Sequence, residues 1–576
     1  MNEFVKYLNS INSAKSESMN ALAESQLLSE YYSKIEVKRE ISNVITRYLK
    51  KDEPESIILT GHAGDGKTSI LIQVLKEFGY FNKGIKPLKI KEEFNNLFYI
   101  KDMSELSVNQ QKELLWKFLK CRKNNMSAMI VSNTGPIINS FKAIFENKVS
   151  DEEIEKKILK GIENTISDEI EITTDSDEYR FRMVNIANID NSYMIESILN
   201  KLLDKELWND CFSCIHKEKC PIYNNYIDVS DNFESVSDQI GKIYFWLSER
   251  GTRLTIRQIL AHITFSLTSN LNCHEISQFA DNLNANRKYS FANGFFGAYD
   301  DSKLKSSALN IKTIKELNKI GLDSKSLGIY DDILFVKEKF NMFPKRVKNR
   351  LENILSTSID DISRNNMNSS NLRKEFRRYF IIFASYFEDR ELIDNLIISE
   401  SFMDYYRAVT SKERLPHSEN RKLKKIIFTA LYRYFVGVYP MKDEEYLYIT
   451  LRKDFNMVQN TQMLIARVPI EDIKIKVEPI KNKVEPEKIQ SKLFLKIGDK
   501  GSFPISAEFL EFMYKFYDGE VFTSLQPSFS FGISKLKTQI LRDYKMDKDK
   551  FTLIVIQNDK VHKMRLEIDK DKIFVD

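Results

Sequence analysis

GHAGDGKT, residues 61–68, joins a short apolar run to a segment with helical periodicity. Its spacing satisfies G-x-x-x-x-G-K-[ST], and its three glycines give the backbone unusual conformational freedom. Residues 57–59 before it predict a buried strand, and residues 68–78 after it predict a helix with apolar Ile70, Leu71 and Val74. A glycine-rich turn between a strand and a helix lets backbone N–H groups surround phosphates. This stretch therefore predicts a phosphate-binding loop.

The loop predicts ATP bound together with Mg²⁺. We expect Lys67 to reach the β- and γ-phosphates, and the Thr68 hydroxyl to hold Mg²⁺. A structural glycine turn with a chance GKT sequence is the alternative, and the matching strand, spacing and helix argue against it. The expected nucleotide-binding residues share the loop and the first turn after it: Gly61, His62, Ala63, Gly64, Asp65, Gly66, Lys67, Thr68 and Ser69.

Apolar strands alternate with helices from residue 55 to about residue 191. Residues 97–100, 128–131 and 181–189 continue the strand pattern, and residues 108–121 are predicted as a helix. This alternation predicts a parallel sheet that binds ligands at the carboxyl ends of its strands. We expect an α/β P-loop NTPase core of AAA+-like type, followed by a helical region and a mixed α+β C-terminal region.

Polar residues follow two of these strands. Asp102 is placed to hold the water shell of Mg²⁺. Met103 stands where a hydrolytic ATPase often carries its glutamate base, so Glu105 is the nearest candidate base; the alternative is that Glu105 only starts the next helix. Asn133 is expected to sense the γ-phosphate, and a turn-starting asparagine is the other reading. The sequence therefore predicts slow hydrolysis, or hydrolysis that a partner completes.

Arginines precede a predicted helix in ERGTRLTIRQIL, residues 249–260. Arg253 or Arg257 could reach the γ-phosphate from the start of such a lid helix, and the sequence does not choose between them. Arg180 and Arg182 could instead act on a neighbouring copy of the chain. Exposed arginines without such a role are the commoner case.

Three cysteines and a histidine lie within ten residues: Cys211, Cys214, His216 and Cys220. Together they could supply four ligands for tetrahedral Zn²⁺. The spacing is not a standard zinc spacing, so an iron–sulfur cluster is a second reading and plain unligated thiols are a third.

The length of 576 residues predicts several domains. The pattern divides the chain into an N-terminal helical segment (1–54), the P-loop domain (55–191), a helical lid region with the cysteines (192–330), a basic helical region (331–439) and a mixed α+β domain (440–576). No apolar run reaches the 18 or so residues that span a bilayer, and the N-terminus lacks a secretory pattern, so we expect a cytoplasmic protein. Five cysteines in so long a chain argue against a disulfide framework.

Basic residues gather in the second half of the chain. Residues 337–435 contain 20 Lys and Arg against 13 Asp and Glu, an excess of 7, with NRKLKKIIF (420–428) among the clusters. In residues 371–380, a helix would bring Arg373, Lys374, Arg377 and Arg378 to one side, where they could contact DNA phosphates, while the aromatic residues between them face the core. Ordinary solvated helix faces are the alternative.

The order of these motifs resembles the DptF family, P-loop ATPases of bacterial DNA phosphorothioation-dependent restriction systems. The resemblance rests on GHAGDGKT, LFYIKDMSEL, AMIVSNTGPI, CFSCIHKEKCP and RLTIRQIL, in that order, and NLRKEFRRYF and FLEFMYKFYDGE are similar as well. It implies an antiphage ATPase that acts beside nuclease or helicase-like partners. Thr68 stands where a serine would be expected in that family, which leaves open a neighbouring AAA+-like or STAND-like family of defence ATPases.

The expected function is thus that of a Mg²⁺-dependent ATPase, a switch or motor in a DNA restriction or defence complex. Its expected partners are other subunits of that complex and DNA, bound directly or through those subunits, and it could form homo-oligomers. A non-hydrolysing, ATP-gated scaffold is the first alternative. A small-molecule kinase is the second, although such kinases are more compact than this chain.

Overall fold

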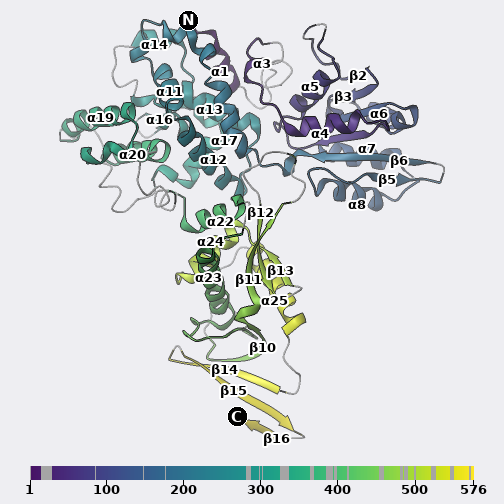
Figure 1. Cartoon of the computed structure of the whole chain (residues 1–576), viewed down its shortest axis with the longest axis vertical. Helices are drawn as coiled ribbons and strands as arrows, with labels where there is room; N and C mark the ends of the chain where they lie inside the picture. Colours follow the sequence, from purple (N-terminus) through teal and green to yellow (C-terminus); the bar gives the residue numbers. More distant parts are fainter. Residues whose placement is uncertain are drawn as a thin grey trace. The chain divides into compact units, whose positions relative to one another are not determined.

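The chain divides into two compact units in the computed structural model (Figure 1). Unit 1 comprises Met1–Arg390 with Lys483–Glu487, and unit 2 comprises Glu391–Asn482 with Lys488–Asp576. The structure describes residues 2–13, 29–82, 84, 86–146, 148–175, 177–279, 287–297, 299–300, 303–324, 336–363, 369–384, 394, 398–411, 414–452, 459–480, 484, 491–498, 501–520, 527–544, 550–558, 560–569 and 572–575.

Unit 1 combines a sheet and the helices around it with a helical region. The sheet contains β1 (Ser56–Thr60), β2 (Lys91–Phe94), β3 (Leu97–Ile100), β4 (Ser127–Val131), β5 (Ile170–Thr173) and β6 (Glu178–Asn185). The helices around it are α3 (Tyr32–Ile35), α4 (Glu40–Leu49), α5 (Lys67–Glu77), α6 (Val108–Cys121), α7 (Thr134–Ile144) and α8 (Asp151–Ile162). The helical region contains the N-terminal helix α1 (Glu3–Ser13), which packs on α13, and α9 (Ile195–Leu202), α10 (Asn209–Phe212), α11 (Pro221–Ser230), α12 (Phe233–Glu249), α13 (Ile256–Thr268), α14 (Cys273–Phe279), α16 (Phe291–Phe295), α17 (Lys312–Ile320), α19 (Lys345–Ser363) and α20 (Ser369–Phe383), with a short hairpin of β7 (Tyr299–Asp300) and β8 (Lys303–Leu304).

The sheet has the strand order β2-β3-β4-β1-β6-β5. Its four inner strands, β3, β4, β1 and β6, run parallel, and the two edge strands pair antiparallel with their neighbours. The expectation of a mostly parallel sheet is therefore confirmed. The edge strands were not predicted, because both are short and half polar, as in the KEEF sequence of β2.

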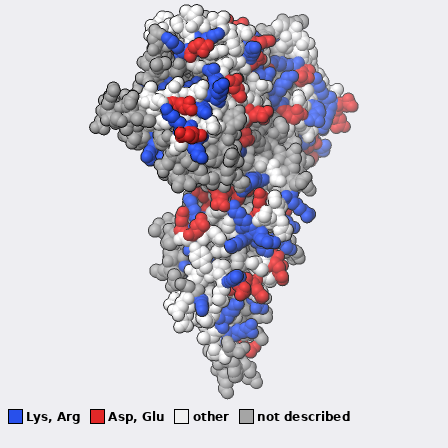
Figure 2. All heavy atoms as spheres, turned by 60° about the vertical axis from the view of Figure 1, so that its left-hand side comes forward, with Lys and Arg blue, Asp and Glu red and all other residues white. Residues whose placement is uncertain are grey.

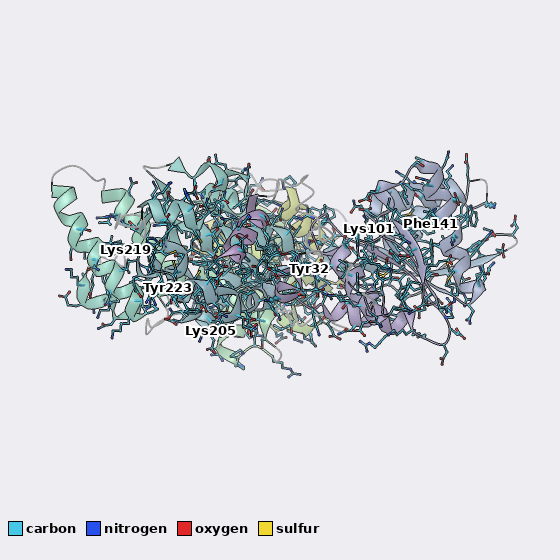
Figure 3. The ribbon with its side chains drawn as sticks, turned by 90° about the horizontal axis from the view of Figure 1, so that it is seen from above. Tyr32, Lys101, Phe141, Lys205, Lys219 and Tyr223 are labelled. Atoms are coloured by element: carbon cyan, nitrogen blue, oxygen red, sulfur yellow. The ribbon has the colours of Figure 1, made fainter. Side chains whose placement is uncertain are left out.

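Side chains on the two faces of the sheet belong to two different apolar clusters. Ile57 and Leu59 of β1 pack with residues of α4 and α5, whereas Ile58 packs with residues of α6, α7 and α8. Consecutive side chains of a strand point to opposite faces, so an uninterrupted apolar run fills both clusters. Tyr32 of the first cluster and Phe141 of the second are labelled in Figure 3.

The end of β6 differs from its prediction. The strand ends at Asn185 rather than Ile189, and a 3₁₀ turn (Ile186–Asn188) follows it. The side chain of Asn185 accepts a hydrogen bond from the backbone N–H of Ala187, a local bond that competes with strand pairing. This early stop places the carbonyl groups of Ile186 and Ile189 beside the glycine-rich loop, where they contribute to the site described below.

Unit 2 is a mixed α+β structure, and it begins at Glu391, so it includes helices that lie before the residue 440 at which the mixed region was expected to start. Its five-stranded antiparallel sheet has the order β16-β15-β14-β10-β9, and a second sheet has the order β11-β12-β13. The strands are β9 (Tyr446–Thr450), β10 (Thr461–Pro469), β11 (Ile473–Pro479), β12 (Ser491–Ile497), β13 (Gly501–Pro504), β14 (Lys550–Gln557), β15 (Lys560–Asp569) and β16 (Lys572–Val575). The helices are α22 (Glu400–Thr410), α23 (His417–Val436), α24 (Ala507–Tyr517) and α25 (Pro527–Tyr544).

Among the described residues, none of the helices combines the length and the apolar character that crossing a bilayer requires.

Candidate nucleotide-binding site

The glycine-rich loop lies between the end of β1 and the start of α5, at the carboxyl edge of the parallel strands. Gly64 and Gly66 have φ angles of 88° and 89°, in the left-handed region that favours glycine. Gly61 has a different requirement, because a Cβ there would lie 2.6 Å from Cγ1 of Ile186. Each glycine of the motif thus has its own conformational or steric reason.

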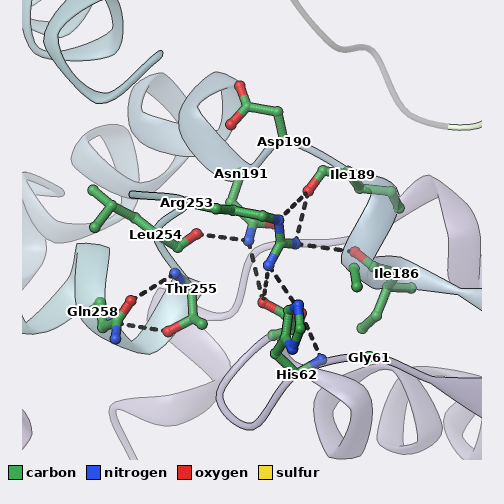
Figure 4. Close-up of polar contacts among 12 residues, drawn as sticks. Gly61, His62, Ile186, Ile189, Asp190, Asn191, Arg253, Leu254, Thr255 and Gln258 are labelled. Carbon is green, nitrogen blue, oxygen red and sulfur yellow. Dashed lines mark hydrogen bonds and ion pairs between the residues drawn. The ribbon is translucent and has the colours of Figure 1, made fainter. Parts of the chain in front are cut away.

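Asp65 fixes the shape of the loop from inside. Its side chain is 1% exposed, and its Oδ2 accepts a hydrogen bond of 3.0 Å from the backbone N–H of His62. Nη1 of Arg253 donates to both carboxylate oxygens, at 2.8 and 3.1 Å (Figure 4). A buried carboxylate needs such a partner to remain ionised. Asp65, predicted to bind nucleotide, is therefore a loop-shaping residue in this structure.

Arg253 uses its remaining donors on the segment after β6. Its Nε and Nη2 donate to the carbonyl of Ile189 at 3.1 and 2.8 Å, and Nη2 also donates to the carbonyl of Ile186 at 3.1 Å. The guanidinium thus ties the loop to the chain that follows the sheet (Figure 4). Of the two arginines proposed to reach the γ-phosphate, Arg253 has its donors engaged in structural contacts.

Arg257 lies in the first turn of α13, directly over the loop. Its backbone N–H donates to the carbonyl of Gly64 at 3.3 Å. The helix start is fixed by a capping box between Thr255 and Gln258. Burial lowers the pKa of the Arg257 guanidinium, which marks a desolvated cation. Arg257 is therefore the arginine that the fold brings to the loop without a carboxylate contact among the described residues.

Lys67, the first residue of α5, is folded back over the loop. Its Nζ donates to the carbonyls of Gly61 and His62 at 2.8 and 3.0 Å, and to Oδ1 of Asn133 at 3.0 Å. Burial lowers the pKa of Lys67, the carboxylates of Asp65 and Asp102 oppose that change, and the nearby Arg257 lowers the pKa further. Two desolvated cations thus lie close together beside a loop of backbone donors.

The strand order explains why Asn133 meets Lys67. Because β4 pairs directly with β1, the residue after β4 lies beside the residue after β1. Asn133 immediately precedes α7, yet its side chain makes no capping bond to that helix and instead accepts from Lys67. The turn-starting role that could also explain this asparagine therefore does not account for its contact.

Asp102 lies at the end of β3, one strand farther from the loop. Its Oδ1 accepts hydrogen bonds from the backbone N–H and the hydroxyl of Ser104, at 2.8 and 2.6 Å. Glu105 ends the short 3₁₀ turn that follows; its side chain is 44% exposed and lies 3.5 Å from Nζ of Lys101. Met103 between them is fully buried. The candidate base thus already has an ion-pair partner.

Thr68 and Ser69 lie in the first turn of α5 and are half-buried. The hydroxyls of Thr68 and Ser69 and the carboxylate of Asp102 are hard oxygen donors of the kind that Mg²⁺ prefers. These donors fit a hydrated Mg²⁺ more readily than a directly ligated one, because Asp102 is engaged with Ser104.

The cysteine cluster lies in the helical region of unit 1. Cys211 is buried in α10, Cys214 is exposed, and Cys220 caps α11, where its Sγ accepts from the backbone N–H of Tyr223 at 3.4 Å. Lys219 and Tyr223, on either side of Cys220, are labelled in Figure 3. Within the described part of the chain, no three His, Cys, Asp or Glu side chains are close enough together to hold a metal as they stand.

A fourth cysteine, Cys273, lies near this cluster and is not among the ligands predicted from the sequence. Burial raises the pKa of Cys211 to about 11 and that of Cys220 to about 12, and the Cys273 thiol adds to both increases. Helix α1 connects the two segments, because Asn2 donates to Sγ of Cys211 at 3.3 Å and Asn9 donates to the carbonyl of Leu271 at 2.7 Å. No local pattern links Cys273 to the others, so only the fold reveals it.

The basic residues of α20 do not form a free ridge. Arg378 is 1% exposed, with its Nε 2.7 Å from Oδ2 of Asp323 and its Nη1 donating to Oδ1 of Asn293 at 3.1 Å. Lys374 lies 3.7 Å from the same Asp323 carboxylate. The hypothesis that all four cations face DNA is therefore wrong for Arg378. The prediction that the aromatic residues of this helix face the core is confirmed for Phe376, Tyr379 and Phe380.

Sheet, loop and helical region together define an α/β protein with a glycine-rich strand–loop–helix at the carboxyl edge of a mostly parallel sheet. Comparison of the chain with models of protein families, with curated proteins and with solved structures found no match. The functional assignment therefore depends on the geometry of the site and on its chemistry.

Proposed function

We propose that this protein is a Mg²⁺-dependent ATPase with a P-loop NTPase core of AAA+-like type. The observation that carries the proposal is the position of Lys67, at the start of α5 and in contact with the loop carbonyls and Asn133. Phosphate oxygens can replace each of those acceptors, and the backbone N–H groups of the loop and helix start add further donors. The lowered pKa of Lys67 fits a cation whose environment lacks sufficient negative charge.

The roles of the other residues follow from their places around Lys67. Thr68 and Asp102 would hold the hydrated Mg²⁺, which neutralises phosphate charge when bound. Asn133 would contact the γ-phosphate, because it already shares a hydrogen bond with the lysine that reaches it. Arg257 would add a second cation from α13, so that ATP joins the sheet to the helical region.

Hydrolysis in this proposal is slow in the isolated protein. Met103 is apolar and buried, and Glu105 is paired with Lys101, so neither side chain is poised to activate water. A partner or DNA that separates Glu105 from Lys101 would complete the site. The alternative is a scaffold that binds ATP without hydrolysing it.

The biological setting we propose is a bacterial DNA restriction or antiphage defence complex in the cytoplasm. The support is the motif order, which resembles that of the DptF family. Partner subunits, a second copy of the chain, or DNA would act as the trigger for turnover.

Phosphate release from Mg²⁺-ATP by the full-length protein tests the ATPase proposal. We expect a slow basal rate that duplex or single-stranded DNA, or a partner, increases. Complete absence of phosphate release under all these conditions, together with measurable ATP binding, would favour the scaffold. Fast release by the isolated protein, lost in Glu105→Gln, would show that the base is already in place.

We also propose that the cysteine cluster holds a metal through thiolates, with Cys273 in the place that the sequence suggested for His216. Thiolate ligands select zinc or an iron–sulfur cluster. Burial raises the pKa of the Cys211 and Cys220 thiols, and the hydrogen bonds from Asn2 to Cys211 and from Tyr223 to Cys220 oppose that increase.

A further inference from the structure

Unit 2 contains a hollow of about 1500 Å³ between helix α23 and strand β11. It lies wholly within this unit and is separate from the nucleotide site in sequence and in fold. Its volume exceeds the roughly 300–1,000 Å³ of ordinary small-molecule pockets. The hollow is therefore large enough for an extended ligand.

One wall of the hollow is a single face of α23. His417, Arg421, Lys424, Lys425 and Phe428 all line it. Their spacing of three or four residues places them on the same side of the helix. Three cations within two turns of α23, Arg421, Lys424 and Lys425, thus line the hollow together with the ring of Phe428.

The opposite wall is the edge strand β11. Lys474 and Lys476 line the hollow and are exposed, whereas Ile473 and Ile475, which alternate with them along the strand, are buried. The side chain of Asn420 donates to the carbonyl of Ile475 at 3.0 Å and holds the strand against α23. The two basic walls are therefore fixed relative to each other.

The cations around the hollow have no carboxylate partner among the residues that the structure describes. No ion pair or side-chain hydrogen bond within that part of the chain involves the lining cations Arg414, Arg421, Lys424, Lys425, Lys442, Lys474 and Lys476. Glu444 is the acidic residue in the described lining, and its oxygens accept from the hydroxyls of Tyr432 and Tyr448. By contrast, Lys422 on another face of α23 lies 2.6 Å from Glu400 and 2.7 Å from Asp404.

The cations also repel one another. Burial lowers the pKa of Lys424, the nearby Lys474 lowers it further, and Glu471 opposes the change. Like charges at close range destabilise a fold unless a ligand of opposite charge neutralises them. The arrangement thus points to an anion with several charges, since no single small anion would neutralise cations on both walls.

The interior of the hollow is apolar and aromatic. Phe428, Tyr439 and Tyr517 contribute rings, and Ile473 and Ile475 contribute aliphatic surface. Tyr439 is 50% exposed, and the Arg433 guanidinium lies 4.4 Å from the centre of its ring. An exposed ring at the mouth of a basic hollow offers a surface for a flat, apolar group that is attached to an anionic chain.

We propose that this hollow binds single-stranded nucleic acid, with the phosphates on the lysine and arginine rims and a base on Tyr439. Single strands combine a polyanionic backbone with exposed base faces, which matches both the charge and the rings of the hollow. A duplex stacks its bases inside and would leave the apolar lining uncovered. Figure 2 shows Lys and Arg side chains on the face of unit 2 that is turned to the viewer, with Asp and Glu side chains among them.

This inference extends the proposed DNA-linked function, but it does not depend on ATP binding. The test uses the full-length protein without nucleotide and a fluorescently labelled oligothymidylate of 20 or so nucleotides, followed by anisotropy over a series of salt concentrations. Each phosphate contact contributes about 0.7 to the slope of log affinity against log salt for a single strand. The Lys67→Ala protein should bind the strand as the parent does, so a failure of the ATPase proposal is distinguishable from a failure of this one.

The decisive variant replaces Arg421, Lys424 and Lys425 with glutamine. The matched control replaces Lys535, Lys560 and Arg565, which are exposed cations of unit 2 outside the hollow, and removes the same charge. We expect the first triple variant to bind at least tenfold more weakly, with a salt slope smaller by about 2. We expect the control to retain the slope, and Tyr439→Ala to lose at least about fivefold in affinity without a change of slope.

Three outcomes would overturn the proposal. One is equal affinity and slope in the two triple variants. Another is tighter binding of a duplex of the same length than of the single strand, because a duplex cannot use the rings. The third is binding of poly-glutamate with equal or greater affinity than the oligonucleotide at matched charge, which would assign the hollow to an acidic protein segment.

Discussion

Arg253 and Arg257, four residues apart, make different kinds of contact in this protein. Arg253 donates to the buried Asp65 and to two backbone carbonyls, so its charge is used within the fold. Arg257 and Lys67 are both desolvated, and each has a lowered pKa, so their charges are available to an anionic ligand. Arg257, in the first turn of α13, thus differs from Arg253 in having no side-chain hydrogen bond or ion pair with the described residues.

Replacing Arg253 with alanine should destabilise unit 1. Asp65 is almost fully buried, and removing one partner of a buried ion pair leaves an uncompensated charge. We expect the free energy of unfolding to fall by about 3 kcal/mol, measured by denaturant titration of full-length protein. A loss below about 1 kcal/mol would contradict the structural role of this arginine.

Arg257→Ala should show the opposite pattern. Its side chain makes no hydrogen bond or ion pair with the described residues, so stability should change by less than about 1 kcal/mol. The affinity for Mg²⁺-ATP should fall roughly tenfold, as expected when a charge-assisted contact to phosphate is lost. Titration with a fluorescent ATP analogue measures this, and unchanged affinity would remove Arg257 from the site.

At the scale of elements, helices α12 and α13 are joined by a buried histidine. His262 is 0% exposed; its Nδ1 lies 2.7 Å from the Tyr244 hydroxyl and its Nε2 lies 2.8 Å from the carbonyl of Phe295. A carbonyl only accepts, so Nε2 carries the proton and Nδ1 accepts from the tyrosine. Both hydrogen bonds of the neutral ring are thus satisfied, and burial lowers its pKa from 6.5 to about 4.

Because His262 is buried in its neutral form, we expect unit 1 to lose stability at acidic pH. Between pH 6.5 and about 4, the unfolded chain binds a proton at this position and the folded chain does not, so stability falls as the pH falls. The loss attributable to His262 should approach about 3 kcal/mol near pH 4. Denaturant titrations at pH 7 and pH 4.5 should show a smaller difference in His262→Gln than in the parent. An equal difference would show that other groups cause the sensitivity.

A second prediction at the scale of elements concerns the metal content of the cysteine cluster. Full-length protein purified without oxygen and without added metal should contain about one zinc ion or one iron–sulfur cluster. We expect Cys273→Ser to lose most of that metal and His216→Ala to retain it, both measured by elemental analysis. The reverse result would restore His216 as the ligand, and metal-free parent protein would favour plain thiols.

At the scale of the whole molecule, local patterns predicted more of the fold than of its long-range contacts. The glycine loop, the inner strands β1, β3 and β4, and the mixed C-terminal region all follow from spacing and periodicity. The Lys67–Asn133 neighbourhood also follows, because parallel strands end at one edge of a sheet. These features depend on residues that lie close in sequence or on a rule about sheets.

Contacts between distant residues could not be predicted in the same way. Arg253 pairs with Asp65 across 188 positions, and Arg378 with Asp323 across 55. A charged residue on an amphipathic helix is ordinarily expected to face water. Arg378 is buried instead, because the buried carboxylate of Asp323 compensates its charge. One basic wall of the hollow in unit 2 could be predicted from the sequence NRKLKKIIF. The second wall could not, because it comes from β11, about 50 residues later.

The central claim is that the loop at residues 61–68 binds the phosphates of ATP through Lys67. The most direct test is equilibrium binding of a fluorescent ATP analogue, with Mg²⁺, to the parent, to Lys67→Ala and to Lys76→Ala. Lys76 lies on the same helix, is partly exposed and pairs with Glu36, so it controls for the loss of a lysine. We predict saturable binding by the parent and by Lys76→Ala, and at least a hundredfold weaker binding by a folded Lys67→Ala protein, about the loss expected for two or three charge-assisted contacts. Equal affinity in all three proteins, or no saturable binding by the parent, would contradict the claim.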